Sequence, residues 1–495
     1  MSVVRHTSYN VAGALIPLAV SIVTVPLYIK VIGTGRYGLL AICWLLVGYF
    51  GLFDFGLGRA TAQKIARLAD ASSRERSSIF WTSALMSLVL SLMAILAFAP
   101  LAKFGLGLMR LDPHELGLQE EVGSALPFLV AALPFGIAQS VLVGALEGRQ
   151  KFLTINLISS AGTIATSVLP LMVAIWSGPD LPNLLAASLV ARSFVFLLLV
   201  PACVQAIPVE RFQMASSRET GRLLGFGGWT TVSNVVGPLM VFWDRFAIGA
   251  ILGSTAVAVY VVPFNLVWQV LIVPGAIMSA LFPRLASAEL RESRRLASQA
   301  ISALAFAMTP STLLMIFAAP PFLTIWLGPE LGLKTAPIAC ILLLGVWINS
   351  FARVPHGHIL ARGEPKLTAL LMISEIIPYA AMFYLLVRLL GLPGAALAWS
   401  VRCAVDSIAL FVIDRTSIRE CMPLLGQSVL MILGVIASLA VPNWSPFRFL
   451  VGAVLLGVAV IIVWTSRPRQ VDQLLKRIRL LVPFLKDARS SSRDF

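Results

Sequence analysis

Long apolar segments separated by short polar loops run along almost the entire chain of 495 residues. An apolar run of about 18 residues or more is long enough to cross the hydrocarbon core of a bilayer as a helix. The pattern therefore predicts an all-α polytopic membrane protein. The fourteen predicted spans are residues 8–32, 37–58, 79–102, 122–146, 153–177, 183–206, 223–249, 255–281, 299–327, 336–360, 367–390, 395–413, 424–441 and 447–466.

The loops between these spans are too short to form a separate domain in water. The longest, 59–78 and 103–121, hold about twenty residues each, which is far below the size of an independent domain. The first apolar run, from Tyr9 to Val31, has no small-residue cleavage site after it. We therefore expect it to remain as the first helix and not to be removed as a signal peptide.

Positively charged residues concentrate on one side of the predicted membrane. If the N-terminus and every second loop face the cytoplasm, that side holds 27 of the 38 lysines and arginines, and the opposite side holds eight. Loops rich in Lys and Arg favour the cytoplasmic side, so both termini are predicted to be cytoplasmic.

The basic C-terminal segment, 467–495, has two interpretations that stay open. Val471, Leu474, Ile478 and Leu481 share one helical face, which is typical of a basic amphipathic helix on the anionic inner leaflet. A solvated tail that helps to set the topology fits the composition equally well.

Composition and motifs exclude several classes of function. With 58% hydrophobic residues and a net charge of +15 carried by short loops, the expected partners are membrane lipids and not nucleic acid. No P-loop, HExxH, GxSxG or spaced cysteine cluster occurs, so we predict no enzyme, no catalytic residue and no cofactor. His356 and His358 are two residues apart on a predicted helix and point in different directions, so we predict no metal site.

Three loop sequences recur in the same order in the two halves of the chain. VIGTGRYG matches AILGSTAV, ARLADASSRERSS matches PRLASAELRESRRLAS, and GRQKFLT matches GEPKLT. The equivalent pairs are Gly33 and Gly253, Arg67 and Arg284, and Lys151 and Lys366, which lie 220, 217 and 215 residues apart. Matches at a slowly changing offset indicate a six-helix unit repeated in parallel.

The repeat predicts how the chain is divided. We expect an N-terminal lobe at 1–210, with spans 1 to 6, and a pseudo-symmetric C-terminal lobe at 211–415, with spans 7 to 12. Two further helices at 416–466 and the basic tail at 467–495 follow them.

Ionisable residues at membrane depth are the chemistry that this chain offers. A charge at the centre of a span costs about 2.5–3.5 kcal/mol on insertion scales, so it normally faces a wet cavity or a charged partner. Arg402 and Asp406 are spaced to pair on one helical face, and Glu375 could join Arg402 or Arg353, so an internal ion-pair lock is one interpretation. Arg192 has no carboxylate at similar depth nearby, which makes it the best candidate to meet an anionic substrate.

Asp54, in the stretch LFDFGLGRA, is an isolated carboxylate near the inner end of the second span. Gly56 and Gly58 loosen the helix end, and Arg59 lies at the basic inner face. We favour an inner gate, with Asp54 bound to Arg59 or to a basic loop of the other lobe, over a proton or cation site. A local helix cap is the structural alternative.

Polar residues also occupy equivalent places in the first and seventh spans. Asn10 and Asn234 lie early in these helices, where amides join helices or line a binding site. Asp244 and Arg245 lie at the outer end of the seventh span and are candidates for a gate or an ion pair.

Four motifs in these spans match one known family: N-x6-P-x8-P in the first span, an LGxxxYG-like exit from it, DFGLGRA, and WDRFAIGAILG at the end of the seventh. The chain resembles Wzx-type polysaccharide flippases of the multidrug/oligosaccharidyl-lipid/polysaccharide exporter superfamily, most specifically over 8–67 and 223–265. The resemblance implies alternating access between two lobes. It also implies movement of an undecaprenyl-diphosphate-linked oligosaccharide from the inner to the outer leaflet of a bacterial cytoplasmic membrane.

For such a flippase, Arg192, Arg353 and Arg402 are the expected cations for the diphosphate. The implied product is an exopolysaccharide, O-antigen or capsule, with polymerase and chain-length machinery as further partners. Outward movement of an anionic diphosphate runs with the inside-negative potential, by about 2.3 kcal/mol per charge per 100 mV, so H⁺ or Na⁺ coupling is compatible but not required.

Three alternatives remain. Lipid II flippases are associated with arginines in the first helix, whereas residues 8–29 contain none. Multidrug/cation antiporters have a carboxylate-based cation site in the first lobe, whereas Asp54 has no second membrane carboxylate beside it in the sequence. A membrane glycosyltransferase or polysaccharide polymerase would be expected to carry large outer loops, which this chain lacks.

Overall fold

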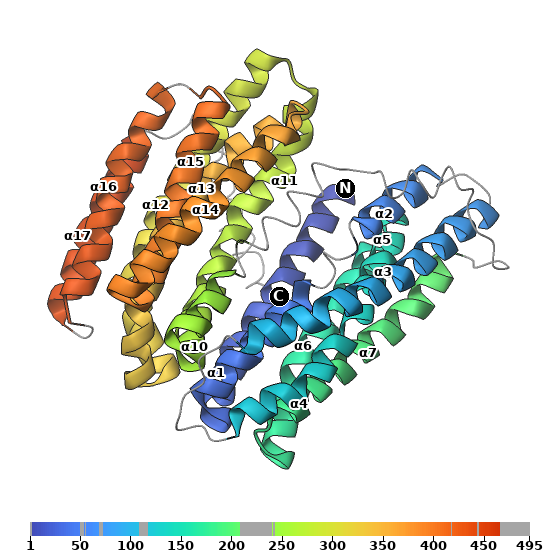
Figure 1. Ribbon diagram of the computed structural model, residues 1–495. Helices are drawn as coiled ribbons and strands as arrows, with labels where there is room; N and C mark the ends of the chain where they lie inside the picture. The colour runs from blue at the N-terminus through green and yellow to red at the C-terminus, as the bar shows by residue number, and fades with distance from the viewer. Residues whose placement is uncertain are drawn as a thin grey trace, which may run out of the picture. The chain divides into compact units, whose positions relative to one another are not determined.

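The computed structural model describes residues 2–49, 54, 56–68, 73–107, 117–207, 240, 243–416, 418–442 and 445–465 (Figure 1). Within these ranges the secondary structure is helical, without strands. Twelve segments there are long and apolar enough to cross a membrane. The all-α polytopic fold is therefore confirmed.

The first seven helices cover the predicted N-terminal lobe. They are α1 (Ser2–Tyr49), α2 (Leu57–Arg67), α3 (Ser73–Gly107), α4 (Leu118–Ala131), α5 (Leu133–Gly148), α6 (Phe152–Ser177) and α7 (Leu181–Ala206).

The second half begins with a helical stretch at 243–252, which is the described end of the predicted seventh span; most of that span and the tail 467–495 lie outside the described residues. The remaining elements are α10 (Ser254–Trp268), the 3₁₀ turn η2 (Gln269–Leu271), α11 (Ile272–Ser287), α12 (Leu290–Leu327), α13 (Pro329–Ala361), α14 (Pro365–Leu390), α15 (Leu392–Ile413), α16 (Ile418–Ala440) and α17 (Pro446–Thr465).

Several helices extend beyond the predicted spans. The predicted start of the ninth span, at 299, is wrong as a helix boundary, because α12 begins at Leu290 and its first turns are charged. A hydropathy pattern detects only the part of a helix that lies in hydrocarbon. It therefore does not detect a polar extension such as the first turns of α12. The second span was predicted to end at 58, whereas the described helix ends at Tyr49, and α2 extends to Arg67, within the predicted loop 59–78.

The six-helix repeat is visible in the helix boundaries and in the backbone. α4, α6 and α7 begin at Leu118, Phe152 and Leu181, and their counterparts α13, α14 and α15 begin 211, 213 and 211 residues later. Gly33 has φ 80° and ψ 166°, and Gly253 has φ 93° and ψ 171°. This conformation is essentially restricted to glycine and agrees with the predicted equivalence, although Gly178 and Gly328 adopt it as well.

A second pair of equivalent turns corrects the predicted register. The amide of Lys151 donates to Leu146 O at 3.0 Å, and the amide of Glu364 donates to Ile359 O at 3.2 Å. Gln150 and Gly363, 213 residues apart, have φ 57° and 78°. Both turns are Schellman-type helix ends. By the geometry of these turns, Lys151 corresponds to Glu364. The sequence match of Lys151 to Lys366 is therefore displaced by two residues, because the two lysines are identical in type but do not lie at the same position of the turn.

The helices form two compact units. Unit 1 contains residues 1–269 and 372–395, and unit 2 contains residues 270–371 and 396–495. Unit 1 therefore includes α10 together with the predicted first lobe. α10 packs closely on the second half of α1: a Cβ added to Gly38 would lie 2.1 Å from the carbonyl oxygen of Ser254.

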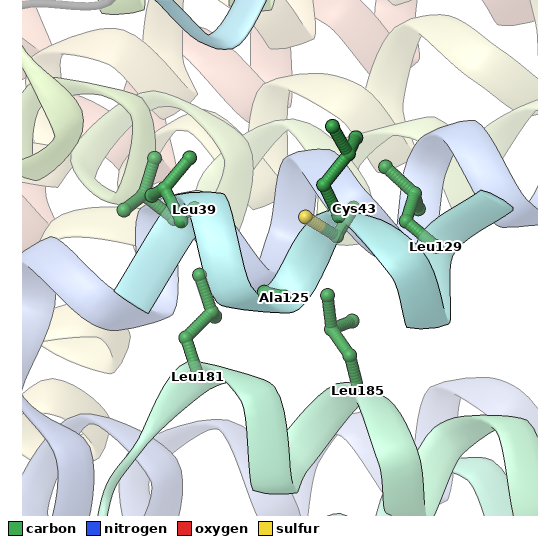
Figure 2. A pocket seen from close by; sticks show the side chains of 8 residues that line it. Leu39, Cys43, Ala125, Leu129, Leu181 and Leu185 are labelled. Atoms are coloured by element: carbon green, nitrogen blue, oxygen red, sulfur yellow. The ribbon is translucent and has the colours of Figure 1, made fainter. Parts of the chain in front are cut away.

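One part of the core of unit 1 is a dry packing of three helices. Leu39 and Cys43 of α1 meet Ala125 of α4 and Leu181 and Leu185 of α7 (Figure 2). The space left between them is about 10 Å³, which is at the lower limit for holding one water. These helices are therefore positioned as one packed body.

In unit 2 the two added helices are fixed by buried polar groups. Arg448 of α17 is 1% exposed and donates to the carbonyls of Ser438, Val441 and Phe317 at 2.8–3.3 Å. Gln427 of α16 accepts a 2.8 Å hydrogen bond from Thr309 of α12. α16 and α17 are therefore attached to the second lobe by buried hydrogen bonds.

Candidate functional site

Asp54 lies at the start of α2, where its carboxylate accepts three hydrogen bonds. The amide of Gly56 donates to Oδ1 at 2.7 Å, the amide of Gly58 donates to Oδ2 at 2.9 Å, and the hydroxyl of Ser140 on α5 also donates to Oδ2. The side chain is buried. Asp54 thus caps the first turn of α2, whose amides have no helical partner, and ties α2 to α5.

Small residues let α2 and α5 approach closely beside this cap. A Cβ added to Gly144 would lie 2.1 Å from the carbonyl oxygen of Gly58, and one added to Gly148 would lie 2.8 Å from that of Ala62. Ser140, Gly144 and Gly148 form a ridge of small residues four apart, a pattern that permits tight helix packing in membranes.

Arg59, which we predicted as a partner of Asp54, is exposed on α2 and interacts electrostatically with Glu147 at the end of α5. The described contacts of Asp54 are therefore those of a cap and tether. Its role as an inner gate stays a prediction.

Asp244 and Arg245 form a buried ion pair in unit 1. Arg245 Nη1 lies 3.3 Å from Asp244 Oδ1, and the two side chains are 2% and 0% exposed. The hydroxyl of Tyr260 donates to Asp244 Oδ2 at 3.1 Å, and the guanidinium of Arg245 lies 4.4 Å from the ring centre of Phe264. Tyr260 and Phe264 both lie on α10, so these contacts hold the helix at 243–252 against α10. The opposite charges of Asp244 and Arg245 neutralise each other.

Arg192 has different surroundings. Ser188, one turn earlier on α7, accepts a 3.0 Å hydrogen bond from the indole of Trp44, which shows that this face of α7 packs against α1. Arg192 lies four residues later on the same face and is half-buried. Within the described residues it forms no ion pair. Its charge is therefore available for an anion or for water.

A large apolar crevice lies along α7, and Arg192 is not among the residues that line it. Phe196, one turn further along α7, lines it together with Trp81 of α3 and Phe135 of α5. Its volume is about 450 Å³. In unit 1, Arg192 thus has no described carboxylate partner and lies one helical turn from Phe196, which lines this apolar crevice.

Arg353 occupies a comparable position in unit 2. It lies on α13, and its Nη1 is 3.7 Å from the place where a Cβ on Gly275 would be. Gly275 on α11 therefore lies beside the guanidinium, at a distance where a Cβ would be in ordinary van der Waals contact. Within the described residues the buried Nε atom of Arg353 has no hydrogen-bond partner. The sequence identified Arg353 but not Gly275, because nothing in one sequence links the two helices.

The other predicted site residues are distributed over both units. Arg402 and Asp406 are one turn apart on α15 in unit 2, the spacing of an intrahelical pair. Glu375 is buried on α14 and belongs to unit 1, so its predicted pairing with Arg402 or Arg353 stays a prediction. Asn10 lies in α1, but its side chain is outside the described residues, as is the whole of Asn234.

Sequence reasoning missed one ion pair near the other end of the lobe. Arg36 on α1 holds Glu121 on α4 with Nη2–Oε1 at 2.6 Å and Nε–Oε2 at 3.0 Å. Glu121 Oε2 also accepts the amide of Leu181 at the start of α7, at 3.2 Å. The two glutamates in the first turn of α4 were the available signal, because carboxylates are favoured at helix N-termini.

Residues 3–289 match the family model described as "Polysaccharide biosynthesis protein". The chain belongs to this family. The resemblance to Wzx-type polysaccharide flippases is thereby confirmed, and the family relationship is to transporters and not to enzymes.

Curated relatives agree with this membership. The chain is 29% identical over 416 residues to the "Putative O-antigen transporter" of Shigella flexneri, covering 83% of this chain and 97% of that one. It is 23% identical to the "Uncharacterized membrane protein EpsK" of Bacillus subtilis (strain 168), over 71% of this chain and 70% of that one.

Solved structures share the fold. The lipid II flippase MurJ in an inward closed conformation matches with a TM-score of 0.67 at 15% identity, covering 93% of this chain and 98% of that one. An inward-facing MATE family transporter of the MOP superfamily matches with a TM-score of 0.66 at 17% identity, over 83% and 98%. The chain is thus a multi-pass membrane protein with the transporter fold of this superfamily.

Proposed function

We propose that this protein flips undecaprenyl-diphosphate-linked oligosaccharide units from the inner to the outer leaflet of the bacterial cytoplasmic membrane, for export of a surface polysaccharide. The family and the relative from Shigella flexneri support a lipid-linked polysaccharide as cargo. Both termini would be cytoplasmic, as the distribution of basic residues predicts. Alternating access would carry the head group across.

The observation that carries this proposal is the neighbourhood of Arg192. The substrate is an amphiphile: its sugar and diphosphate are polar and its polyprenyl chain is apolar. An arginine without a described carboxylate partner suits a diphosphate, because the guanidinium donates several hydrogen bonds to phosphate oxygens. The apolar crevice one turn away, about 450 Å³, suits part of the chain. Arg353 and Arg402 would supply further cations, and Asn10 and Asn234 would bind sugar hydroxyls.

The drive and the partners complete the proposal. Movement of the negative diphosphate out of the cell is favoured by the inside-negative potential. Exchange for H⁺ or Na⁺ would add to this drive. The flipped unit is the substrate of a polymerase, so polymerase and chain-length proteins are the expected partners.

Complementation of a flippase-null strain tests the proposal. We expect the parent chain to restore surface polymer and Arg192→Glu to abolish it, with lipid-linked repeat units accumulating on the inner leaflet and protein levels unchanged. Arg192→Lys should retain part of the export, because the charge remains. Lys334→Glu is the control, since that side chain is 60% exposed. Normal export by Arg192→Glu would remove Arg192 from the site.

A further inference from the structure

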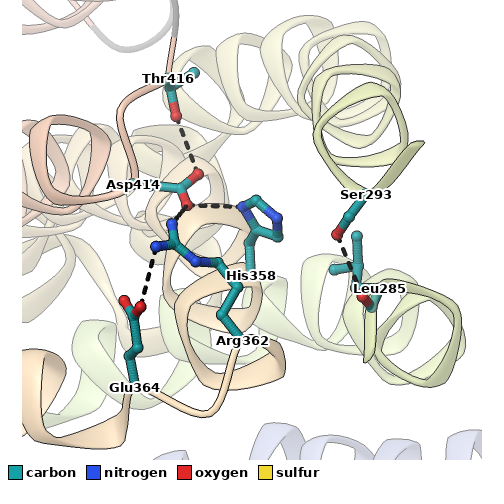
Figure 3. A network of polar contacts seen from close by, with 7 residues as sticks. All are labelled: Leu285, Ser293, His358, Arg362, Glu364, Asp414 and Thr416. Atoms are coloured by element: carbon teal, nitrogen blue, oxygen red, sulfur yellow. Dashed lines mark hydrogen bonds and ion pairs between the residues drawn. The ribbon is translucent and has the colours of Figure 1, made fainter. Parts of the chain in front are cut away.

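A buried histidine–carboxylate pair joins the ends of α13 and α15 in unit 2. His358 Nδ1 lies 2.7 Å from Asp414 Oδ1, and the hydroxyl of Thr416 donates to Asp414 Oδ2 at 3.2 Å (Figure 3). Arg362 completes the group: its Nη1 is 3.9 Å from Asp414 Oδ1, and its Nη2 is 3.1 Å from Glu364 Oε1. His358 and Asp414 are 0% and 6% exposed.

The electrostatic balance at this place depends on His358. Asp414 directly follows α15, so its negative charge meets the negative end of the helix dipole and needs a cation nearby. Arg362 divides its charge between Asp414 and Glu364 and is the more distant partner of Asp414. His358, in the last turn of α13, is the closer partner, and its charge depends on whether it has bound a proton.

The second ring nitrogen of His358 has no hydrogen-bond partner within the described residues. Buried polar atoms are nearly always paired, so this atom is an exception that requires an explanation. With Nδ1–H donating to Asp414, Nε2 carries the lone pair that accepts a proton. A proton bound there makes the ring a cation 2.7 Å from Asp414 Oδ1, which supplies the positive charge that this carboxylate needs at the end of α15.

Most other charged side chains near this end of unit 2 are exposed. α11 carries Arg284, and the chain entering α12 carries Glu289, Arg291, Glu292, Arg294 and Arg295, all of which are exposed. On α13 itself, His356 interacts with Arg353. Arg415 follows Asp414 in a left-handed turn, Lys366 is exposed on α14, and the side chains of Arg419 and Glu420 on α16 lie outside the described residues.

We propose that His358 Nε2 is a proton-binding site, held by Asp414, and that proton uptake there favours the conformation in which the ends of α13 and α15 stay together, whereas proton release favours their separation. One proton from water adds to the ring, and its release to water restores the neutral ring. As a coupling device in transport, which rests on the proposed function, the site would make flipping depend on pH.

Hydrogen–deuterium exchange of the full-length protein in nanodiscs tests the site without transport. At pH 8, amides 410–416 should be equally protected in the parent chain and in His358→Asn, whose amide still donates to Asp414. At pH 6 they should exchange about fivefold more slowly in the parent than in the variant at the same pH, because only the parent gains a positive charge beside Asp414. Asp414→Asn should lose the pH response as well, and His356→Asn should keep it. Equal exchange in the parent and His358→Asn at both pH values would overturn the proposal.

Flipping in proteoliposomes separates this inference from the proposed function. The probe is a fluorescent undecaprenyl-diphosphate oligosaccharide, with the same buffer on both sides of the membrane. The parent rate should change about fivefold between pH 8 and pH 6, and His358→Asn should flip the probe at a rate independent of pH. A pH response that survives in His358→Asn contradicts the inference. Absence of flipping in the parent chain contradicts the proposed function, and the exchange experiment then decides the proton site alone.

Discussion

Replacement of Asp54 by alanine distinguishes a structural cap from a gate residue. The carboxylate accepts the amides of Gly56 and Gly58 at 2.7 and 2.9 Å and the hydroxyl of Ser140 on α5. Asp54→Ala would leave the amides at the start of α2 without an acceptor and would release the contact to α5. We therefore expect a less stable protein.

The size of the effect follows from these contacts. Loss of a helix cap costs about 0.5–2 kcal/mol, and a hydrogen bond to a charged group contributes about 1.5–3 kcal/mol. Asp54→Ala should therefore lower the free energy of unfolding by about 2–5 kcal/mol. Asp54→Asn keeps an acceptor oxygen but loses the charge, so we expect a loss of about 1–2 kcal/mol.

Reversible unfolding in mixed micelles measures these differences, with Ser193→Ala as control. Ser193 donates only to Leu189 O in its own helix, so the control should stay within about 0.5 kcal/mol of the parent. Because Asp54 and Ser140 share a bond, Asp54→Ala combined with Ser140→Ala should cost about 0.5–3 kcal/mol less than the sum of the two single changes. If Asp54→Ala is as stable as the parent but does not export polymer, the carboxylate is a gate residue and the cap argument is wrong.

Two further substitutions test the helix packing by the same unfolding assay. Gly144→Ala should lose about 1–3 kcal/mol, because the new Cβ would lie 2.1 Å from the carbonyl of Gly58, whereas Gly123→Ala, with nothing within 4 Å, should gain about 0.5–1 kcal/mol. Equal stability of these two variants would show that α2 and α5 are not in close contact. Arg448→Met should lose about 2–4 kcal/mol by leaving buried carbonyl groups unpaired. Lys334→Met, at an exposed position, should change stability by less than about 0.5 kcal/mol, and a similarly small effect for Arg448→Met would contradict its role in holding α16 and α17.

Much of the fold was predictable because membranes restrict what a chain can do. Each backbone group in hydrocarbon needs an internal partner, so long apolar runs become helices. The repeat was predictable because Gly33 and Gly253 share a conformation that essentially only glycine adopts. Helix ends were less predictable. The restart of α2 after Tyr49 depends on the cap by Asp54 and on Ser140 from α5, and a contact across 86 residues leaves no local pattern.

The candidate site was predictable in its residue types but not in its pairings. Sequence reasoning placed arginines and carboxylates at membrane depth, because charges there are rare and easily recognised. It could not tell which of them are satisfied. Their spacing along the chain predicted that Asp54 pairs with Arg59. In the structure the carboxylate of Asp54 accepts hydrogen bonds from amides at the start of α2, and Arg59 interacts with Glu147. The His358–Asp414 pair was missed for the same reason, since its members lie 56 residues apart.

The arginines of this chain differ in function because they differ in what neutralises them. Arg245 is almost fully buried against Asp244 and the ring of Phe264, and Arg448 is surrounded by carbonyl oxygens, so each already has its counter-groups and holds helices together. Arg192 has the same guanidinium but is half-buried, and it has no ion-pair partner within the described residues. A cation kept in hydrocarbon without such a partner is costly, so a protein retains it where an anion or water arrives from outside. Under the proposed function, the diphosphate of the lipid-linked oligosaccharide would be the anion that removes this cost.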